Sequence, residues 1–233
     1  MERNHQRDER ILAHIGLYRL TFRRVLSVLF FDGRTAGNIV QRLCAEGRIQ
    51  ARGGLPQRLF YYQLTLAEAS RRGLPVARSR PPKPQAFHAH LAILWHCCMS
   101  PAHRQRRRLE RHELEKLFGN RVPGGPHLIE AGPTPRVFRV QVVGPGTPAR
   151  SAVRALRRRV EYVRRRPELR AWVHNRQYAF LLLTDTPGRC ARIAEIAKRH
   201  AIPSRAQVEF AHVPDYRAAG AALRAAKPRP RAP

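Results

Sequence analysis

The chain has 233 residues and carries a formal net charge of +29, because 45 lysine and arginine side chains outnumber 16 acidic ones. Hydrophobic residues make up 43% of the sequence, enough for a sizeable core in one or two domains. Four basic residues are lysine (Lys83, Lys116, Lys198 and Lys227), and the other 41 are arginine. Such a charge implies a polyanionic partner, and nucleic acid is the leading candidate because guanidinium groups fit phosphate oxygens and guanine edges.

An anionic membrane surface is the alternative partner, but the sequence argues against a membrane and against secretion. No apolar run approaches the roughly 20 residues of a membrane-spanning helix, and the opening stretch MERNHQRDER is polar, without a signal pattern. The four cysteines, Cys44, Cys97, Cys98 and Cys190, do not form the framework of a secreted disulfide-bonded protein. We therefore expect a cytoplasmic protein, associated with the nucleoid or with plasmid DNA.

Periodic apolar residues and tight turns predict a first domain over residues 1–75. An apolar stripe over residues 11–15 gives one helix its buried face, and Gly16 ends or weakens that helix. Thr21 is the expected N-cap of a second helix, whose inward residues lie between 22 and 29.

A third helix and a hairpin follow closely. The helix is expected over 35–46, and strands over 48–52 and 58–64 flank a Gly-Gly-Leu-Pro turn. Thr65 and Glu68 then form a capping box for a fourth helix. Three helices, a two-stranded ribbon and a helix are the order of a winged helix-turn-helix, in which the third helix enters a DNA groove.

The outward face of the third helix carries the residues best suited to read DNA bases. Ile39 and Leu43 point inward, so the opposite face presents Asn38, Gln41 and Arg42. Asparagine and glutamine can each pair bidentately with adenine, and arginine with guanine. We therefore expect this helix to enter a major groove of double-stranded DNA.

Four further residues around this helix and the hairpin are expected to hold the DNA backbone. Arg34 and Thr35 lie at the helix start, where the helix dipole favours phosphate, and Arg52 and Arg58 flank the hairpin tip. The alternatives are that these are ordinary solvated polar residues, or that the winged helix binds protein. The high net charge favours DNA.

The rest of the chain divides into a linker, a second domain and a tail. Residues 76–86, VARSRPPKPQA, have the composition of a stiff exposed linker, and residues 217–233 that of a disordered basic tail. The domain between them, 87–216, is expected to hold a mixed sheet covered by helices on both sides. Its expected helices lie over 87–98, 104–119, 147–169 and 187–200, and its strands over 126–132, 135–143, 178–184 and 207–212.

Two clusters in the second domain bear on ligands. In the helix over 147–169, Arg154, Arg157 and Arg158 lie off the apolar stripe and are expected to bind DNA phosphates without reading sequence. The alternative is a solvated charged face. Histidines and cysteines are dense between residues 88 and 103, but their spacing matches no zinc pattern, so we expect no metal and no other cofactor.

Taken together, the two halves resemble the replication-relaxation family of plasmid and integrative-element proteins. The likeness rests on YRLTFRRVLSVLF, QRLCAEGRIQAR and YYQLTLAEASRRGL in the first half, and on PHLIEAG, VFRVQVVGPGT and YAFLLLTD in the second. The resemblance implies an α+β chain, with an N-terminal winged helix-turn-helix followed by a mixed α/β domain similar to the PD-(D/E)xK nuclease fold.

The resemblance also implies where a nuclease would hold its metal, and those positions lack acids. His127 stands where the motif has its aspartate, Gln141 where it has the second acid, and Val143 two residues further on. Glu130 is the only acid nearby, and one carboxylate does not make a magnesium site. We therefore expect an inactive nuclease scaffold, able to bind DNA or to form a homodimer or a partner interface.

The expected function is that of a non-enzymatic, sequence-specific DNA-binding protein of a mobile genetic element, acting in transcription control or in replication or transfer. A metal-dependent DNA nuclease is the alternative, and it would need a rearranged acidic cluster with Asp185 and Glu161. RNA binding is a third hypothesis, suggested by arginine content alone. No RNA-recognition aromatic motif supports it, since Tyr61 and Tyr62 are better explained as core of the hairpin.

Overall fold

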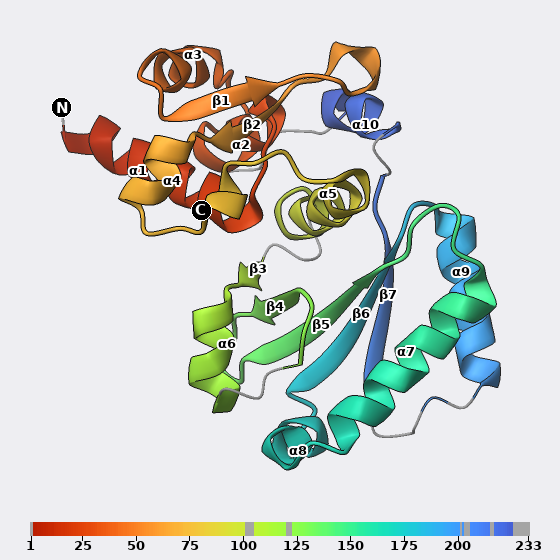
Figure 1. Ribbon diagram of the computed structural model, residues 1–233. Helices are drawn as coiled ribbons and strands as arrows, with labels where there is room; N and C mark the ends of the chain where they lie inside the picture. The colour runs from red at the N-terminus through yellow and green to blue at the C-terminus, as the bar shows by residue number, and fades with distance from the viewer. Residues whose placement is uncertain are drawn as a thin grey trace. The chain divides into compact units, whose positions relative to one another are not determined.

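The computed structural model describes residues 2–100, 105–119, 123–200, 202, 206–214 and 217–225 (Figure 1). Within these residues the chain has ten α-helices, one two-stranded sheet and one five-stranded sheet, which confirms the expected α+β class. It divides into two compact units, Met1–Pro101 with Pro214–Pro233, and Ala102–Val213. No helix in the described part of the chain is long and apolar enough to cross a bilayer.

Three helices, a hairpin and a fourth helix open the first unit, in the order expected. This unit contains α1 (Glu2–Tyr18), α2 (Arg23–Phe30), α3 (Gly37–Ala45), β1 (Ile49–Arg52), the 3-10 turn η1 (Pro56–Arg58), β2 (Tyr61–Leu64), α4 (Leu66–Arg71), the 3-10 turn η2 (Val76–Arg78), α5 (Pro84–Cys98) and α10 (Ala219–Ala225). β1 and β2 pair antiparallel. The core that joins the helices to the hairpin contains Ile11, Leu12, Ile15, Leu26, Ala36, Ile39, Val40, Leu43, Ile49, Leu64 and Ala69.

Two residues near the first turn differ from the sequence-based expectation. Gly16 does not end α1, which continues to Tyr18; a Cβ at Gly16 would lie 2.9 Å from Leu74 Cδ1, so the glycine allows close packing. Thr21 is not an N-cap, because it is buried and its backbone exchanges two hydrogen bonds with Tyr62, 3.0 and 2.9 Å long. The connection between α1 and α2 is thereby fixed to the hairpin.

The proline-rich segment 76–86 lies inside the first unit and does not link two domains, although seven of its eleven residues are exposed as expected. Arg78 donates hydrogen bonds of 2.9 and 3.1 Å to carbonyl oxygens of α1. The helix that follows also belongs to the first unit, where the ring of Phe87 contacts that of Tyr61 at 5.2 Å. The unit boundary therefore lies at residue 101, later than the composition suggests.

Part of the expected disordered tail, 217–233, is helical. α10 covers Ala219–Ala225, and its Ala219 and Leu223 side chains are buried. The high helix propensity of alanine and this short apolar face explain the ordered segment. The remainder, 226–233, lies outside the described residues.

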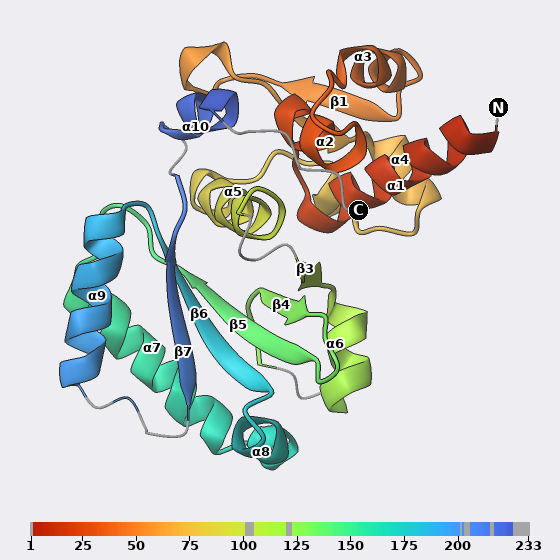
Figure 2. The ribbon, with the colours of Figure 1, turned by 180° about the vertical axis from the view of Figure 1, so that it is seen from behind.

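The second unit is built on a mixed five-stranded sheet. It contains β3 (Arg106–Leu109), α6 (Arg111–Phe118), β4 (His127–Glu130), β5 (Arg136–Val142), α7 (Ala149–Arg164), α8 (Pro167–His174), β6 (Tyr178–Thr184), α9 (Pro187–Arg199) and β7 (Gln207–His212). The strand order is β3-β4-β5-β6-β7, antiparallel from β3 to β5 and parallel from β5 to β7 (Figures 1 and 2). All seven residues of β6 are buried, as expected from its continuous apolar sequence.

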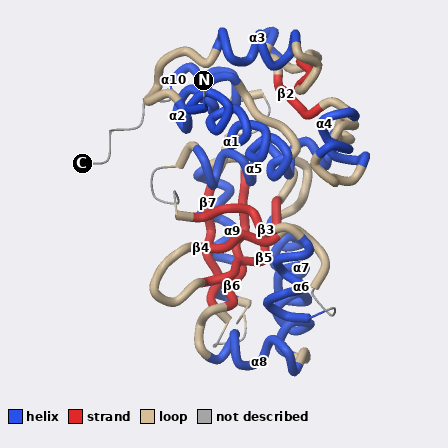
Figure 3. Tube along the Cα trace, turned by 90° about the vertical axis from the view of Figure 1, so that its left-hand side faces the viewer, coloured by secondary structure: helices blue, strands red, loops and turns tan. Residues whose placement is uncertain are grey.

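The helices of the second unit share one apolar core with one face of its sheet (helices blue and strands red in Figure 3). The predicted apolar stripe of α7, formed by Val153, Leu156, Val160 and Val163, lies in this core. It packs there with alternate residues of β6, namely Tyr178, Phe180 and Leu182. Residues of α6, α8 and α9 join the same cluster. Helices were expected on both faces, but within this unit all four contribute to this one.

Two expected helices are shorter in the structure. In place of the expected helix over 104–119, the described residues form strand β3 and then α6, which begins at a capping box made by Glu110 and Glu113. The stretch 147–169 breaks into α7 and α8, because Pro167 cannot continue a helix but fits the first position of a new one.

Candidate nucleic-acid interface

Hydrogen bonds from flanking residues fix both ends of α3. Ser27 Oγ accepts a 3.1 Å hydrogen bond from the Ala36 amide, and Thr35 Oγ1 accepts one of 3.2 Å from the Gly37 amide. At the other end Gly47 has a φ of +66°, a left-handed conformation that suits glycine and turns the chain into β1. α3 is therefore a short helix held in a defined direction between α2 and the hairpin.

The two faces of α3 divide as the sequence predicts. Ile39, Val40 and Leu43 are buried in the core of the first unit. Asn38 and Gln41 are exposed, and among the described residues their side-chain amides have no hydrogen-bond partner. Both amides therefore keep their donors and acceptors available for another molecule.

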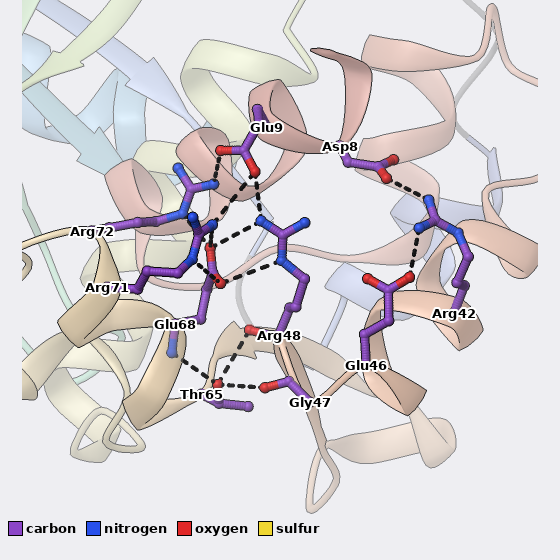
Figure 4. Close-up of polar contacts among 10 residues, drawn as sticks. All are labelled: Asp8, Glu9, Arg42, Glu46, Gly47, Arg48, Thr65, Glu68, Arg71 and Arg72. Atoms are coloured by element: carbon purple, nitrogen blue, oxygen red, sulfur yellow. Dashed lines mark hydrogen bonds and ion pairs between the residues drawn. The ribbon is translucent and has the colours of Figure 1, made fainter. Parts of the chain in front are cut away.

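Arg42 differs from these two residues, because its guanidinium group is held by two carboxylates (Figure 4). It contacts Asp8 of α1 at 2.5 Å and Glu46 at 2.7 Å, and these hydrogen bonds raise the pKa of Arg42. Asp8 is itself only 4% exposed. Arg42 thus ties α3 to α1 in this conformation, with its side chain 45% exposed.

A second network of charged groups fixes the hairpin and α4 against α1 (Figure 4). The buried carboxylate of Glu68 accepts hydrogen bonds from Arg72 (2.6 Å), Arg71 (2.7 Å) and Arg48 (3.3 Å). Glu9 of α1 accepts from Arg48 at 2.5 Å and also from Arg71 and Arg72. Two carboxylates, from α1 and α4, therefore hold Arg48 beside β1 and the adjacent Arg71 and Arg72 at the end of α4.

This network explains why only half of the expected capping box forms. Thr65 Oγ1 accepts a 3.3 Å hydrogen bond from the Glu68 amide, as an N-cap should. The Glu68 carboxylate does not return to the Thr65 amide, which instead donates to the Arg48 carbonyl at 3.1 Å. Glu68 thus serves the ion-pair network.

A basic groove lies beside the start of α3. It has a volume of about 640 Å³ and is lined by Phe22, Arg23, Arg24, Ser27, Gly33, Thr35, Arg58, Leu59, Phe60 and Tyr62, with Gly220 and Leu223 of α10. Within the described residues, the side chains of Arg23 and Arg58 have no hydrogen bond or ion pair. Phe60 is an exposed aromatic, 52% accessible, at the same groove.

The predicted backbone contacts divide around this groove. Thr35 and Arg58 line it; Arg34 is exposed and Arg52 is half-buried, and neither is among the lining residues. Sequence reasoning missed Arg23, Arg24 and Phe60. The adjacent arginines at the start of the second helix could have been predicted as phosphate contacts, because a helix N-terminus favours anions. Their position beside Arg58 depends on the tertiary fold, which the local sequence does not reveal.

In the second unit, the predicted phosphate-contacting arginines share one hollow of α7. Arg154, Arg157 and Arg158 line it with Ser151 and Glu161, and its volume is about 590 Å³. Arg157 pairs with Glu161 at 3.0 Å, and Arg154 contacts the Ser151 hydroxyl at 3.4 Å. All three arginines are exposed, as their position off the apolar stripe predicts.

The positions expected to match a nuclease motif are occupied by packed side chains. His127 is fully buried; its Nδ1 donates to the Gly125 carbonyl (3.1 Å), and its Nε2 accepts from the Tyr178 hydroxyl (2.9 Å). Burial lowers the pKa of His127 to about 4, so it is neutral at pH 7. Gln141 is also buried and donates to the Ala152 carbonyl at 3.0 Å.

The acids that could serve a metal in this unit are paired with arginines. Glu130 contacts Arg106 at 2.5 Å and Arg136 at 3.5 Å, and Asp185 contacts Arg189 at 3.1 Å. In the part of the chain that the structure describes, no group of three histidines, cysteines or acids is placed to hold a metal ion. His103, a member of the histidine and cysteine cluster, lies outside the described residues.

No family model, curated protein or solved structure matches this chain. The geometry of the candidate interface is therefore the basis for assigning a function.

Proposed function

We propose that the first unit is a winged helix-turn-helix that binds double-stranded DNA, with α3 in the major groove and the β1–β2 hairpin on the flanking backbone. One observation carries this proposal: α3 exposes the unpartnered amides of Asn38 and Gln41, while its other face is buried. Exposed side-chain amides without a hydrogen-bond partner can pair bidentately with adenine.

The charges around α3 support the same proposal. The groove beside its N-terminus carries Arg23 and Arg58, and Arg34 is exposed next to it. DNA phosphates on either side of a major groove would meet these guanidinium groups. Arg42, held by Asp8 and Glu46, positions α3 on α1 in this account, so base contact is assigned to Asn38 and Gln41.

We propose for the whole chain the role of a non-enzymatic DNA-binding protein of a mobile genetic element, in transcription control or in replication or transfer. The second unit is proposed to be a nuclease-like scaffold of the PD-(D/E)xK type without catalytic acids. Its support is the neutral, buried His127 and the buried Gln141 at the motif positions. Its arginine-rich α7 would add contacts to the DNA backbone.

The groove arginines provide the test of DNA binding. Changing Arg23→Ala together with Arg58→Ala is expected to weaken binding to all duplexes alike and to flatten the slope of log K against log salt by up to ~0.9 per lost contact. Fluorescence anisotropy over a salt series measures both quantities. The matched control is Arg111→Ala with Arg170→Ala, two exposed arginines of the second unit. Equal slopes for the groove variant and the control would contradict the proposal.

The nuclease alternative has its own test. With magnesium or manganese, the purified protein is expected to leave linear, supercoiled and single-stranded DNA uncut, because Glu130 and Asp185 are paired with arginines and His127 is buried. Gel analysis of plasmid and oligonucleotide substrates gives the result. Cutting by the wild-type chain that disappears in Glu130→Ala would establish the alternative, a metal-dependent nuclease.

A further inference from the structure

We infer that the second unit binds a phosphate group in a pocket between β5 and α7. This pocket has a volume of about 440 Å³ and is lined by Gly124, Arg139, Ala155, Arg158, Arg159 and Tyr162. Three of the six lining residues are arginines, and none is acidic. The inference concerns a different surface from α3 and does not depend on the first unit.

The hydrogen-bonding state of the three arginines is the main evidence. Arg139 Nη2 donates to the Gly124 carbonyl at 2.9 Å, but its Nε and Nη1 are buried without a partner. Within the described residues, the side chains of Arg158 and Arg159 make no hydrogen bond or ion pair. Buried donors without acceptors are costly, so the Nε and Nη1 of Arg139 lack acceptor oxygens, and the exposed Arg158 and half-buried Arg159 can turn toward the same ligand.

The charge balance points in the same direction. Burial lowers the pKa of Arg139, and burial together with the charge of Arg139 lowers the pKa of Arg159. Two guanidinium groups are therefore partly removed from water beside each other with no carboxylate between them. On the same helix, Arg157 lies outside this pocket and is neutralised by Glu161 at 3.0 Å.

A phosphate group fits these requirements better than a simple halide. It supplies several oxygens and at least one negative charge, and planar guanidinium forks bind such oxygens bidentately. A free phosphate, a nucleotide and nucleic acid all present such oxygens; a free or terminal phosphate carries a charge near −2, and a backbone diester carries about −1. A bound phosphate would offset the repulsion between Arg139 and Arg159 and satisfy their open donors.

The test is isothermal titration calorimetry of the full chain with inorganic phosphate, in chloride buffer at constant ionic strength. Arg159→Met keeps the packing of the side-chain stem and removes the charge, and it is expected to weaken phosphate binding about tenfold or more. Arg164→Met, an exposed arginine of the same helix outside the pocket, is the control and should change the affinity less than about twofold.

Thermal unfolding separates a binding role from a structural one. Without phosphate, Arg159→Met should unfold at the same temperature as wild type or higher, because a like charge has been removed. Added phosphate should raise the midpoints of wild type and Arg164→Met alike, and that of Arg159→Met much less. If Arg159→Met fails to fold, the exposed Arg158→Met replaces it in both experiments. Equal phosphate affinity in the pocket variant and in Arg164→Met would overturn the inference and leave only general attraction to a basic surface.

A final comparison identifies the source of the phosphate. Short duplexes with and without a 5′-phosphate are titrated into wild type and Arg159→Met. A preference for the phosphorylated duplex that Arg159→Met loses assigns the pocket to a strand end, and an equal loss for both duplexes assigns it to backbone phosphates. Loss of inorganic phosphate binding alone assigns it to a small free ligand. Asn38→Ala should leave inorganic phosphate affinity unchanged, so failure of base reading and failure of this pocket are distinguishable.

Discussion

Replacing Glu68 with glutamine is expected to lower the free energy of unfolding of the first unit by about 3 kcal/mol at pH 7. The Glu68 carboxylate is 4% exposed and accepts hydrogen bonds from three arginines, so its loss leaves Arg48, Arg71 and Arg72 sharing the single charge of Glu9. Uncompensated charges in a partly buried site are far more costly than the loss of a surface pair.

Denaturant unfolding of the Glu68→Gln variant measures this effect. The chain has two tryptophans, Trp95 in α5 of the first unit and Trp172 in α8 of the second, so a Trp172→Phe background makes fluorescence report on the first unit. Glu46→Gln is the control in the same unit, because it breaks only an exposed pair with Arg42 and should cost less than about 1 kcal/mol. Equal midpoints for Glu68→Gln and wild type would contradict the account.

Acid should remove the difference between wild type and Glu68→Gln. Burial alone would raise the pKa of Glu68, but hydrogen bonds from Arg71, Arg48 and Arg72 lower it to about 2, from an ordinary value of 4.5. Above pH 4.5 the carboxylate is ionised in both the folded and the unfolded chain, and its stabilisation is complete. As pH falls from 4.5 toward 2 the unfolded chain takes up the proton first, so this stabilisation is lost.

Removing the amides of α3 should abolish most of the preference for one DNA sequence. Asn38→Ala and Gln41→Ala are each expected to reduce discrimination at one base pair by ~1–3 kcal/mol, about 5- to 150-fold, because a bidentate amide–adenine contact is worth that much. Affinity for random DNA should change little, since phosphate contacts supply it. Competition binding with single-base variants of the preferred site measures both.

Arg34→Ala is the matched comparison for these two variants, because Arg34 precedes α3 and is also exposed. It is expected to lower affinity for preferred and random DNA by the same factor. If Asn38→Ala and Gln41→Ala behave in this way too, the two amides are backbone contacts and α3 is not a reading helix.

Much of the fold could be predicted from the sequence because local patterns and packing agree. The apolar run of β6 correctly predicts a buried strand and the apolar stripe of α7 correctly predicts a helix, since both pack into one core. Short elements were harder. The arginine-rich stretch Arg106–Leu109 looks helical by itself, but it pairs with His127–Glu130, and its strand state follows from that distant partner.

The candidate site was predicted in part for the same reason. Helical periodicity alone separates Asn38 and Gln41 from the buried face of α3. It does not reveal that Asp8, on another helix, would hold Arg42, nor that Arg139 and Arg159 would meet without a carboxylate. Such pairings depend on how elements from distant parts of the sequence pack, which periodicity does not encode.

Selection from a pool of randomised duplexes tests the central claim, that α3 of the first unit reads DNA sequence. The full chain is bound to the pool at moderate salt, the retained DNA is sequenced over successive rounds, and the Asn38→Ala, Gln41→Ala double variant is run in parallel. The account predicts that wild type enriches one defined motif and that the double variant binds DNA without enriching it. Retention of DNA by wild type with no enriched sequence would contradict the claim and leave a nonspecific DNA-coating protein.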